Sequence, residues 1–184
     1  MMDEAKANVA PPVEVTPQVF RAWRDARRGT AHPEVLSNPY WEWLQRSKTS
    51  SYAANGHFGG PSSLGGAPAW SWDRFGRSVT VLPDGRRLFI AGEHEDYYDP
   101  DFFIYNDVVI ERPGGRVEFL GYTTEDFPPT DFHSATFVGG QVILIGNLGY
   151  EEDRRQGECQ ILILNLAGMT VSRQASAGEG PGWI

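Results

Sequence analysis

The feature of this sequence that most constrains its fold is an internal repeat. The stretch FHSATFVGGQVILIG at Phe132–Gly146 has a counterpart, RSVTVLPDGRRLFIAG, at Arg77–Gly92. Ser78 matches Ser134 at a separation of 56 residues, and the turn and strand-end glycines match at 55 and 54. Each copy predicts a strand, a tight turn and a more apolar strand. A repeat of this period indicates stacked structural units and so constrains the architecture before the function.

Each copy continues as a predicted four-stranded antiparallel meander of about 50 residues, which is the size of a propeller blade. The strands expected in the first copy cover 77–82, 88–91, 104–110 and 117–121. Those expected in the second copy cover 134–138, 142–145, 159–164 and about 170–173. Between the second and third strands of the first copy, the polar stretch EHEDYYDPDF predicts a loop.

The segment that precedes the repeat predicts helices. Thr16-Pro17 and Asn38-Pro39 each offer a capping side chain followed by proline at the first helical position. We expect the first helix to end at Gly29 and the second near Arg46. The expected organisation is a mobile arm at 1–15, a helical cap at 16–48, a Gly/Ser-rich linker at 49–69, and blades at about 70–123 and 124–177 with the start of a third up to 184.

Charge and cysteine content limit the partners and the compartment. The net charge is −8, with +1 in residues 1–50 and −9 in residues 51–184. An acidic body argues against a nucleic-acid backbone as the main partner. Cys159 is the single cysteine, so neither an intrachain disulfide nor a cysteine metal knuckle can form. No signal peptide or membrane-spanning run is evident, and we expect a cytoplasmic chain that binds no membrane.

The repeats resemble the kelch family, the galactose-oxidase-like β-propellers. The resemblance rests on His133-Ser134-Ala135, the Gly139-Gly140 turn and the aliphatic strands, and it covers about 77–173. The family's strand-ending glycine pair is replaced by Ala91-Gly92 and Ile145-Gly146. The resemblance implies a mainly β fold, a partial β-propeller of two kelch-like four-stranded antiparallel blades with an N-terminal helical cap. Because a propeller needs about 4–8 blades, we expect a homo-oligomer or a fragment of a longer propeller.

The meander brings the loops between strands to one end of the blades. These loops are acidic and aromatic, whereas the hairpin turns at the other end are basic where they are charged. We predict a binding site at the loop end. Its candidate residues are Asp73, Glu93, His94, Glu95, Asp96, Tyr97, Tyr98, Asp99, Asp101, Asp126, Asp131, His133 and Tyr150.

Carboxylates and aromatic rings together suit a cationic partner, because charge pairing and cation–π contacts both favour Arg and Lys. We therefore expect a non-catalytic binding or scaffold module for a basic protein or peptide. The alternative is a metal-dependent hydrolase or oxidoreductase at the Glu93–Asp101 loop and His133, because carboxylate and imidazole are metal ligands. The sequence assigns no catalytic residue and identifies no cofactor. His133 and Ser134 adjoin in a strand and point to opposite faces, which argues against a base–nucleophile pair.

Overall fold

The computed structural model describes residues 9–61, 66–96, 99–146, 148–154 and 157–178, with only the backbone at 95, 96 and 99–101. The fold is mainly β, as predicted, and its sheets are antiparallel and open. The chain forms two compact units. Unit 1 comprises Met1–Arg27, Ser37–Arg74 and His94–Phe103, and unit 2 comprises Arg28–Leu36, Phe75–Glu93 and Ile104–Ile184.

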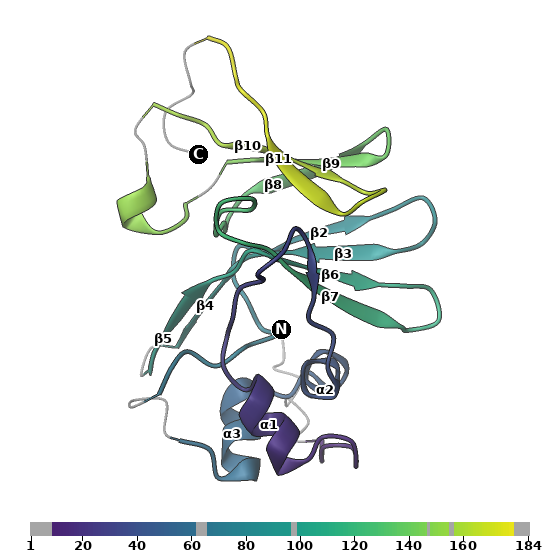
Figure 1. Ribbon diagram of the computed structural model, residues 1–184, viewed down its shortest axis with the longest axis vertical. Coiled ribbons are helices and arrows are strands. Elements are labelled where there is room, and N and C mark those ends of the chain that lie inside the picture. Colours follow the sequence, from purple (N-terminus) through teal and green to yellow (C-terminus); the bar gives the residue numbers. More distant parts are fainter. Residues whose placement is uncertain (1–8, 62–65, 97–98, 147, 155–156, 179–184) are drawn as a thin grey trace, which may run out of the picture. The chain divides into compact units, whose positions relative to one another are not determined.

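Unit 2 contains two antiparallel sheets, and both follow the predicted meander (Figure 1). Sheet 1 has the strand order β1-β7-β6-β3-β2. Its strands are β1 (Glu34–Val35), β2 (Ser78–Val81), β3 (Arg87–Ile90), β6 (Asp107–Glu111) and β7 (Val117–Gly121). Sheet 2 has the order β11-β10-β9-β8. Its strands are β8 (Ser134–Val138), β9 (Gln141–Ile145), β10 (Ile161–Asn165) and β11 (Thr170–Arg173).

The predicted two-residue turn between the first strands of the second copy is present. Val138 pairs with Gln141, and Gly139 and Gly140 between them have φ values of 54° and 87°. Both angles lie in the left-handed region that glycine adopts without a steric penalty, as a tight hairpin turn requires. The turn therefore fixes the register of β8 on β9.

A single hydrophobic cluster packs the two sheets together. The core face of sheet 1 contributes Leu88, Ile90, Val108, Ile110 and Leu120. The core face of sheet 2 contributes Val142, Leu144, Leu162, Leu164 and Val171. Burying one aliphatic side chain of this size stabilises a fold by about 1.5–3 kcal/mol, so this cluster is a major source of cohesion in unit 2.

Hydrogen bonds close the cluster at both edges of the sheets. Ser78 Oγ on β2 lies 2.8 Å from His133 Nε2, which directly precedes β8. At the other edge the Tyr122 hydroxyl donates to the Met169 carbonyl at 2.7 Å. The two first strands, β2 and β8, lie beside each other. Both sheets are thus oriented in the same way, with their first strands at a common edge.

Unit 1 is built from helices around an aromatic core. Its helices are α1 (Pro17–Trp23), α2 (Pro39–Ser47) and α3 (Ser51–Phe58). The rings of Trp41 and Trp70 stack with centroids 4.6 Å apart, and both side chains are buried. Phe20 contacts Tyr40 edge to face at 5.5 Å. The aromatic residues that the sequence concentrates near α2 therefore serve as a core.

The prediction for the end of the first helix was wrong. Helix α1 starts at the predicted Thr16-Pro17 cap but stops at Trp23, well before Gly29. The backbone beyond Trp23 pairs with residues 68–70 instead, since Trp70 N–H donates to Arg24 O at 2.7 Å and Ala26 N–H donates to Pro68 O at 2.8 Å. Tertiary pairing of this kind overrides local helix propensity.

Three further elements lie where the sequence predicted other structure. Helix α3 occupies part of the expected linker, where Ser50 accepts from Ala53 N–H and Gly59 ends the helix at φ 61°. The expected polar loop forms a two-stranded sheet of β4 (Glu93–Asp96) and β5 (Asp99–Ile104). The expected strand 104–110 is therefore divided, and only Asp107–Glu111 belongs to sheet 1.

The fifth strand of sheet 1 was also missed, because it comes from the expected helical cap. In β1, Glu34 pairs with Gly121 and Val35 with Leu120 on β7. Glycine is needed here for close backbone approach. A Cβ atom on Gly29 would lie 2.3 Å from the carbonyl carbon of Gly121.

Candidate functional site

The loop end of unit 2 is organised around one short segment, which we call the anchored loop (residues 148–154). The buried Asp131 side chain accepts from Gly149 N–H at 2.5 Å, and its backbone carbonyl accepts from Leu148 N–H at 3.3 Å. The Arg154 guanidinium donates back to the carbonyls of Leu148 at 2.6 Å and Gly149 at 3.0 Å. These contacts fix the loop at both of its ends.

Tyr150 provides a third fixed point for the anchored loop. Its hydroxyl oxygen accepts from Ile104 N–H at 3.0 Å and from the Arg28 guanidinium at 3.3 Å. Arg28 also donates to Asn106 Oδ1 at 2.9 Å, and burial lowers the pKa of Arg28. Tyr150 thus links the loop to residues from two distant parts of the chain. The sequence predicted Tyr150 as a site residue, and the structure gives it an anchoring contact.

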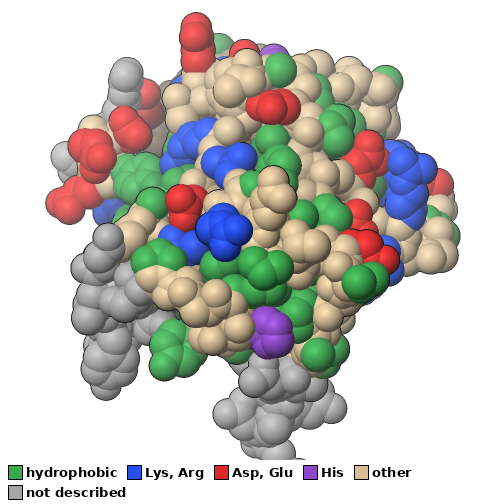
Figure 2. Space-filling view, turned by 60° about the horizontal axis from the view of Figure 1, so that its bottom comes forward, with side chains coloured by type: hydrophobic (Ala, Val, Ile, Leu, Met, Phe, Trp, Pro, Cys, Tyr) green, Lys and Arg blue, Asp and Glu red, His purple; other side chains and the backbone are tan. Residues whose placement is uncertain are grey.

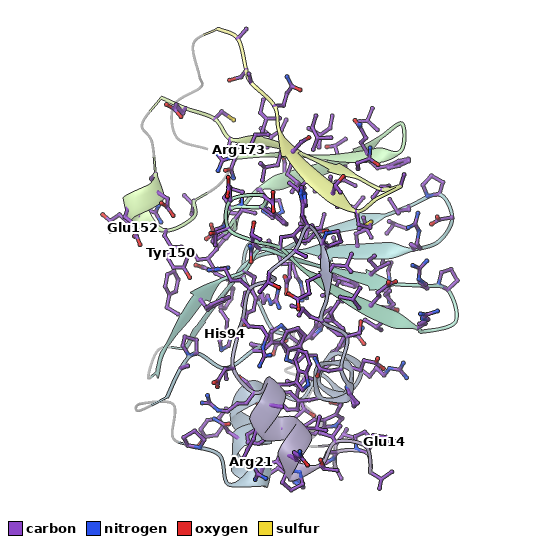
Figure 3. All side chains as sticks on the ribbon, viewed as in Figure 1. Glu14, Arg21, His94, Tyr150, Glu152 and Arg173 are labelled. Atoms are coloured by element: carbon purple, nitrogen blue, oxygen red, sulfur yellow. The ribbon has the colours of Figure 1, made fainter. Side chains whose placement is uncertain are left out.

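The anchored loop exposes three consecutive acidic residues. The 3-10 helix η2 (Glu151–Asp153) has no buried residue, and each of its side chains is exposed. Figure 3 shows Glu152 directed away from unit 2 and Tyr150 on the same loop. The predicted set did not include these acids, although the sequence placed their loop at this end. The Gly-Tyr-Glu-Glu-Asp run was the available signal.

Two predicted carboxylates from different loops meet at the base of the anchored loop. Burial raises the pKa of Asp131, while Gly149 N–H, the Glu93 side chain and the Arg154 charge act in the opposite direction. The Glu93 side chain thus lies beside the Asp131 carboxyl group. The structure therefore places Glu93 and Asp131 at the base of the loop that carries Tyr150.

His133 lies inside unit 2 and not on the loop surface. Its side chain is buried, Nε2 contacts Ser78 Oγ, and Nδ1 has no hydrogen-bond partner among the described residues. Burial lowers the pKa of His133 to about 4, so the imidazole is neutral at pH 7. Hydrolytic sites also pair serine with histidine, but no acidic side chain among the described residues orients this ring through Nδ1.

Asp126 makes its contacts at the other edge of the two sheets. Its carboxylate accepts from Thr123 Oγ at 2.7 Å and lies 3.2 Å from His32 Nδ1. His32 Nε2 in turn accepts from Val171 N–H on β11 at 2.6 Å. Asp126 therefore helps to join the edges of the sheets, and its described contacts do not involve the anchored loop.

The remaining predicted residues belong to unit 1 or lie outside the described part. In unit 1, His94 Nδ1 lies 3.0 Å from the Asp73 carbonyl oxygen, and both residues are half-buried. The described residues exclude Tyr97 and Tyr98. The structure describes the backbone, but not the side chains, of Glu95, Asp96, Asp99 and Asp101.

Two exposed aromatic side chains at the loop end were missed by the prediction from sequence. Phe75 is 62% exposed and Phe132 is 53% exposed. Phe132 directly follows Asp131, and its φ of 47° is unusual for a residue with a large side chain. Its amide donates to Gly76 O at 2.9 Å, and this contact places it next to the Phe75 segment. Exposed aromatic rings are features that a cationic group can use.

The hairpin-turn end of sheet 1 contains basic residues that are paired with acidic ones. Arg86 lies 2.8 Å from Asp84, Arg112 lies 2.8 Å from Glu118, and Arg87 contacts Glu111. Figure 2 shows blue and red side chains together at its right-hand edge, the side of these turns in Figure 1. The turn end is therefore close to balanced in charge, which sharpens the contrast with the exposed acids of η2.

Metal binding gains no support from the residues whose side chains the structure describes. Within that part of the chain, no three His, Cys, Asp or Glu side chains lie close enough to hold an ion. The predicted alternative site extends over Glu93–Asp101, where the side chains of 95–101 are not described.

Comparison with known proteins adds no further assignment. No family model, characterised protein or solved structure matches this chain. In the described part of the chain, none of the helices has the length and apolar character needed to cross a bilayer. We therefore infer the function from the site itself.

Proposed function

We propose that this protein is a non-catalytic binding module whose anchored loop recognises a basic segment of a protein or peptide. The observation that supports this proposal is the fixed display of Glu151–Asp153 on a loop held by Asp131, Arg154 and Tyr150. A preorganised loop loses little conformational freedom on binding, so more of the interaction energy appears as affinity.

The chemistry of the loop end suits Arg and Lys side chains. Glu151–Asp153 supply exposed carboxylates for ion pairs, and Phe75 and Phe132 supply exposed ring faces for cation–π contacts. Exposed ion pairs contribute about 0.2–1 kcal/mol each. The expected affinity is therefore moderate, and it should fall as salt screens the charges.

The proposed architecture is a partial β-propeller of kelch type. Three observations support it: each sheet contains a four-stranded meander of matching order, their first strands lie side by side, and a common core fills the space between their faces. In such an arrangement the loops between strands emerge at one end of every blade. The loop end would then be the natural binding surface of a scaffold protein, with the hairpin turns at the opposite end.

The proposal can be tested with a fluorescently labelled arginine-rich peptide. In an anisotropy titration, the triple variant E151Q/E152Q/D153N should weaken binding by about 1–2 kcal/mol, or about 5- to 30-fold. The matched control D84N/E111Q/E118Q removes the same charge at the turn end and should leave the dissociation constant almost unchanged. Equal effects of the two variants would show non-specific attraction and contradict the proposal.

The β4–β5 acids provide a separate arm of the same experiment. The sequence predicts that neutralising Asp96, Asp99 and Asp101 weakens binding of a basic partner. If D96N/D99N/D101N abolished peptide binding while E151Q/E152Q/D153N had no effect, the site would lie on that hairpin and the anchored-loop proposal would be wrong. No contact among the described residues favours the hydrolase or oxidoreductase alternative.

A further inference from the structure

Sheet 2 has an outer face, opposite the core face, on which four isoleucines form a continuous patch. Ile143 pairs with Ile163, and Ile145 pairs with Ile161 across β9 and β10. All four side chains are partly exposed, and Ile145 is 38% exposed. When one face of an antiparallel sheet is exposed to water, apolar and polar residues normally alternate along each strand, so that the exposed face is polar. This outer face departs from that rule.

The outer face also lacks charge among its described residues, in a chain of net charge −8. Its other positions are small, polar and uncharged, apart from one valine. The residues on this face, in register, are Ser134, Thr136, Val138, Gln141, Ile143, Ile145, Ile161, Ile163, Asn165, Thr170 and Ser172. Contiguous apolar surface exposed on a soluble protein commonly marks a contact with another molecule. The composition of the outer face instead favours contact with another surface.

The registers of the strands show which face of sheet 1 corresponds, in the repeat, to the outer face of sheet 2. Ser78 pairs with Ile90, which pairs with Val108, on the core face of sheet 1. In the second repeat, Ser134 pairs with Ile145, which pairs with Ile161. The outer face of sheet 2 therefore occupies the place that the core face has in sheet 1. In sheet 1 the apolar residues of that face are buried because sheet 2 covers them.

The opposite faces obey the same equivalence. Phe89 pairs with Val109 on the back face of sheet 1, and the matching positions in sheet 2 are Leu144 and Leu162 on its core face. The back face of sheet 1 also carries charged residues, among them Arg87 and Glu111, so it does not match the uncharged outer face of a second copy. The surface that a second copy can offer to an outer face is its own outer face.

We propose that two copies of this chain associate by stacking the outer faces of sheet 2 about a two-fold axis. An uncharged face is complementary to itself, so this is a place where two acidic chains can meet without charge repulsion. The β-branched isoleucines of the two copies would interdigitate as the two sheets of unit 2 do within one copy. The contact is sheet on sheet and leaves the strand edges free.

Sedimentation equilibrium on the full chain tests the proposal. Thr136 and Ser172 are exposed and lie in register with Ile143 and Ile163, so lysine at either position should not disturb folding. The wild-type protein should have twice the mass of the chain, and T136K and S172K should each raise the dimer dissociation constant at least about tenfold. Val81 on β2 is 66% exposed, and V81K, the matched control, should remain dimeric.

Salt dependence gives a second measurement that separates this contact from peptide binding. An uncharged apolar interface should be unchanged or strengthened by sodium sulfate, whereas binding of a basic peptide should weaken with salt. A wild-type protein that stays monomeric at all accessible concentrations would overturn the proposal. So would a dimer that persists equally in T136K and S172K, because the outer face would then lie outside the interface.

Discussion

Sheets 1 and 2 have the same meander and share one core, but they differ in how their second faces are covered. On sheet 1, the core face is buried, and so are Phe89, Val109 and Phe119 on the back face. On sheet 2, the core face is buried while Ile143 and Ile163 on the outer face remain partly exposed. The two repeats are alike in sequence and topology, so the difference lies in their surroundings.

The sequence of β10 shows what this difference means. Its residues ILIL form an unbroken apolar run, which is typical of strands buried on both faces. In the structure only Leu162 and Leu164 are buried. The strand thus has the composition of a strand that is buried on both faces, although only one of its faces is buried in the structure. Alternation in β8, where Ser134 and Thr136 are exposed, is by contrast consistent with a single buried face.

The largest effects on the free energy of unfolding should come from alanine substitutions on the buried faces of the sheets, compared with one on the outer face of sheet 2. Ile110→Ala and Phe119→Ala, on opposite faces of sheet 1, should each lower the free energy of unfolding by about 2–5 kcal/mol. Leu164→Ala on sheet 2 should cost the same, because the residue has no exposed surface. Ile163→Ala, its neighbour on the outer face, should cost about 1 kcal/mol or less in the monomer. Urea unfolding measures all four.

The measurement of Ile163→Ala needs a protein that cannot associate. We therefore place it in the T136K variant and compare it with T136K alone, so that no second copy buries the isoleucine. If Ile163→Ala were as costly there as Leu164→Ala, the outer face would be covered within one chain. The contrast between the sheets would then disappear, and with it the reason to expect stacking.

The next largest effect should come from His133, at the edge where β2 and β8 meet. Burial holds its pKa at about 4 in the folded state, below the ordinary value of 6.5. The unfolded chain therefore takes up the proton first as the pH falls, and the folded state loses stability between about pH 6.5 and pH 4. The loss should reach about 3 kcal/mol and level off below pH 4. Urea titrations at pH 7 and pH 4.5 measure it.

The matched variant is H133Q, which keeps a side-chain amide near Ser78 but cannot titrate. Over the same pH interval, the free energy of unfolding of H133Q should fall by about 3 kcal/mol less than that of the wild-type protein. Asp131 acts in the opposite sense, because its raised pKa makes the folded state bind a proton more readily and gain stability as the pH falls. Comparing the double variant D131N/H133Q with D131N isolates the contribution of His133 to the pH dependence of stability. Parallel pH curves for the two proteins would contradict burial of a neutral imidazole.

The sequence was sufficient to predict the features that depend on local pattern. The repeat, the Gly139-Gly140 turn and the two meanders follow from alternation and turn chemistry within short windows. The helix caps at Thr16 and Asn38 were likewise readable from single residues. The order of the strands also predicted that the loops carrying Glu93, Asp131 and Tyr150 emerge at one end of the meanders.

Features that depend on distant contacts could not be predicted in this way. Helix α1 ends early because the backbone that follows Trp23 forms hydrogen bonds with residues 68–70. No pattern in the neighbouring sequence predicts this pairing. The anchored loop needs contacts from Asp131 to Gly149 and from Ile104 to Tyr150, each across many residues. The sequence also could not distinguish a buried His133 from a ligating one, because desolvation is set by the packing of both sheets.

The smallest expected effect concerns β1, the fifth strand of sheet 1. Gly29→Ala would place a Cβ atom 2.3 Å from Gly121, so the segment leading to β1 must move away from β7. We expect a loss of about 1–3 kcal/mol in the free energy of unfolding. The control is Gly168→Ala in sheet 2, where the nearest atoms lie 3.6 Å from the new Cβ and the change should be under about 0.5 kcal/mol. Equal stabilities of the two variants would mean that β1 contributes nothing to sheet 1, and that the two sheets differ only in the covering of their faces.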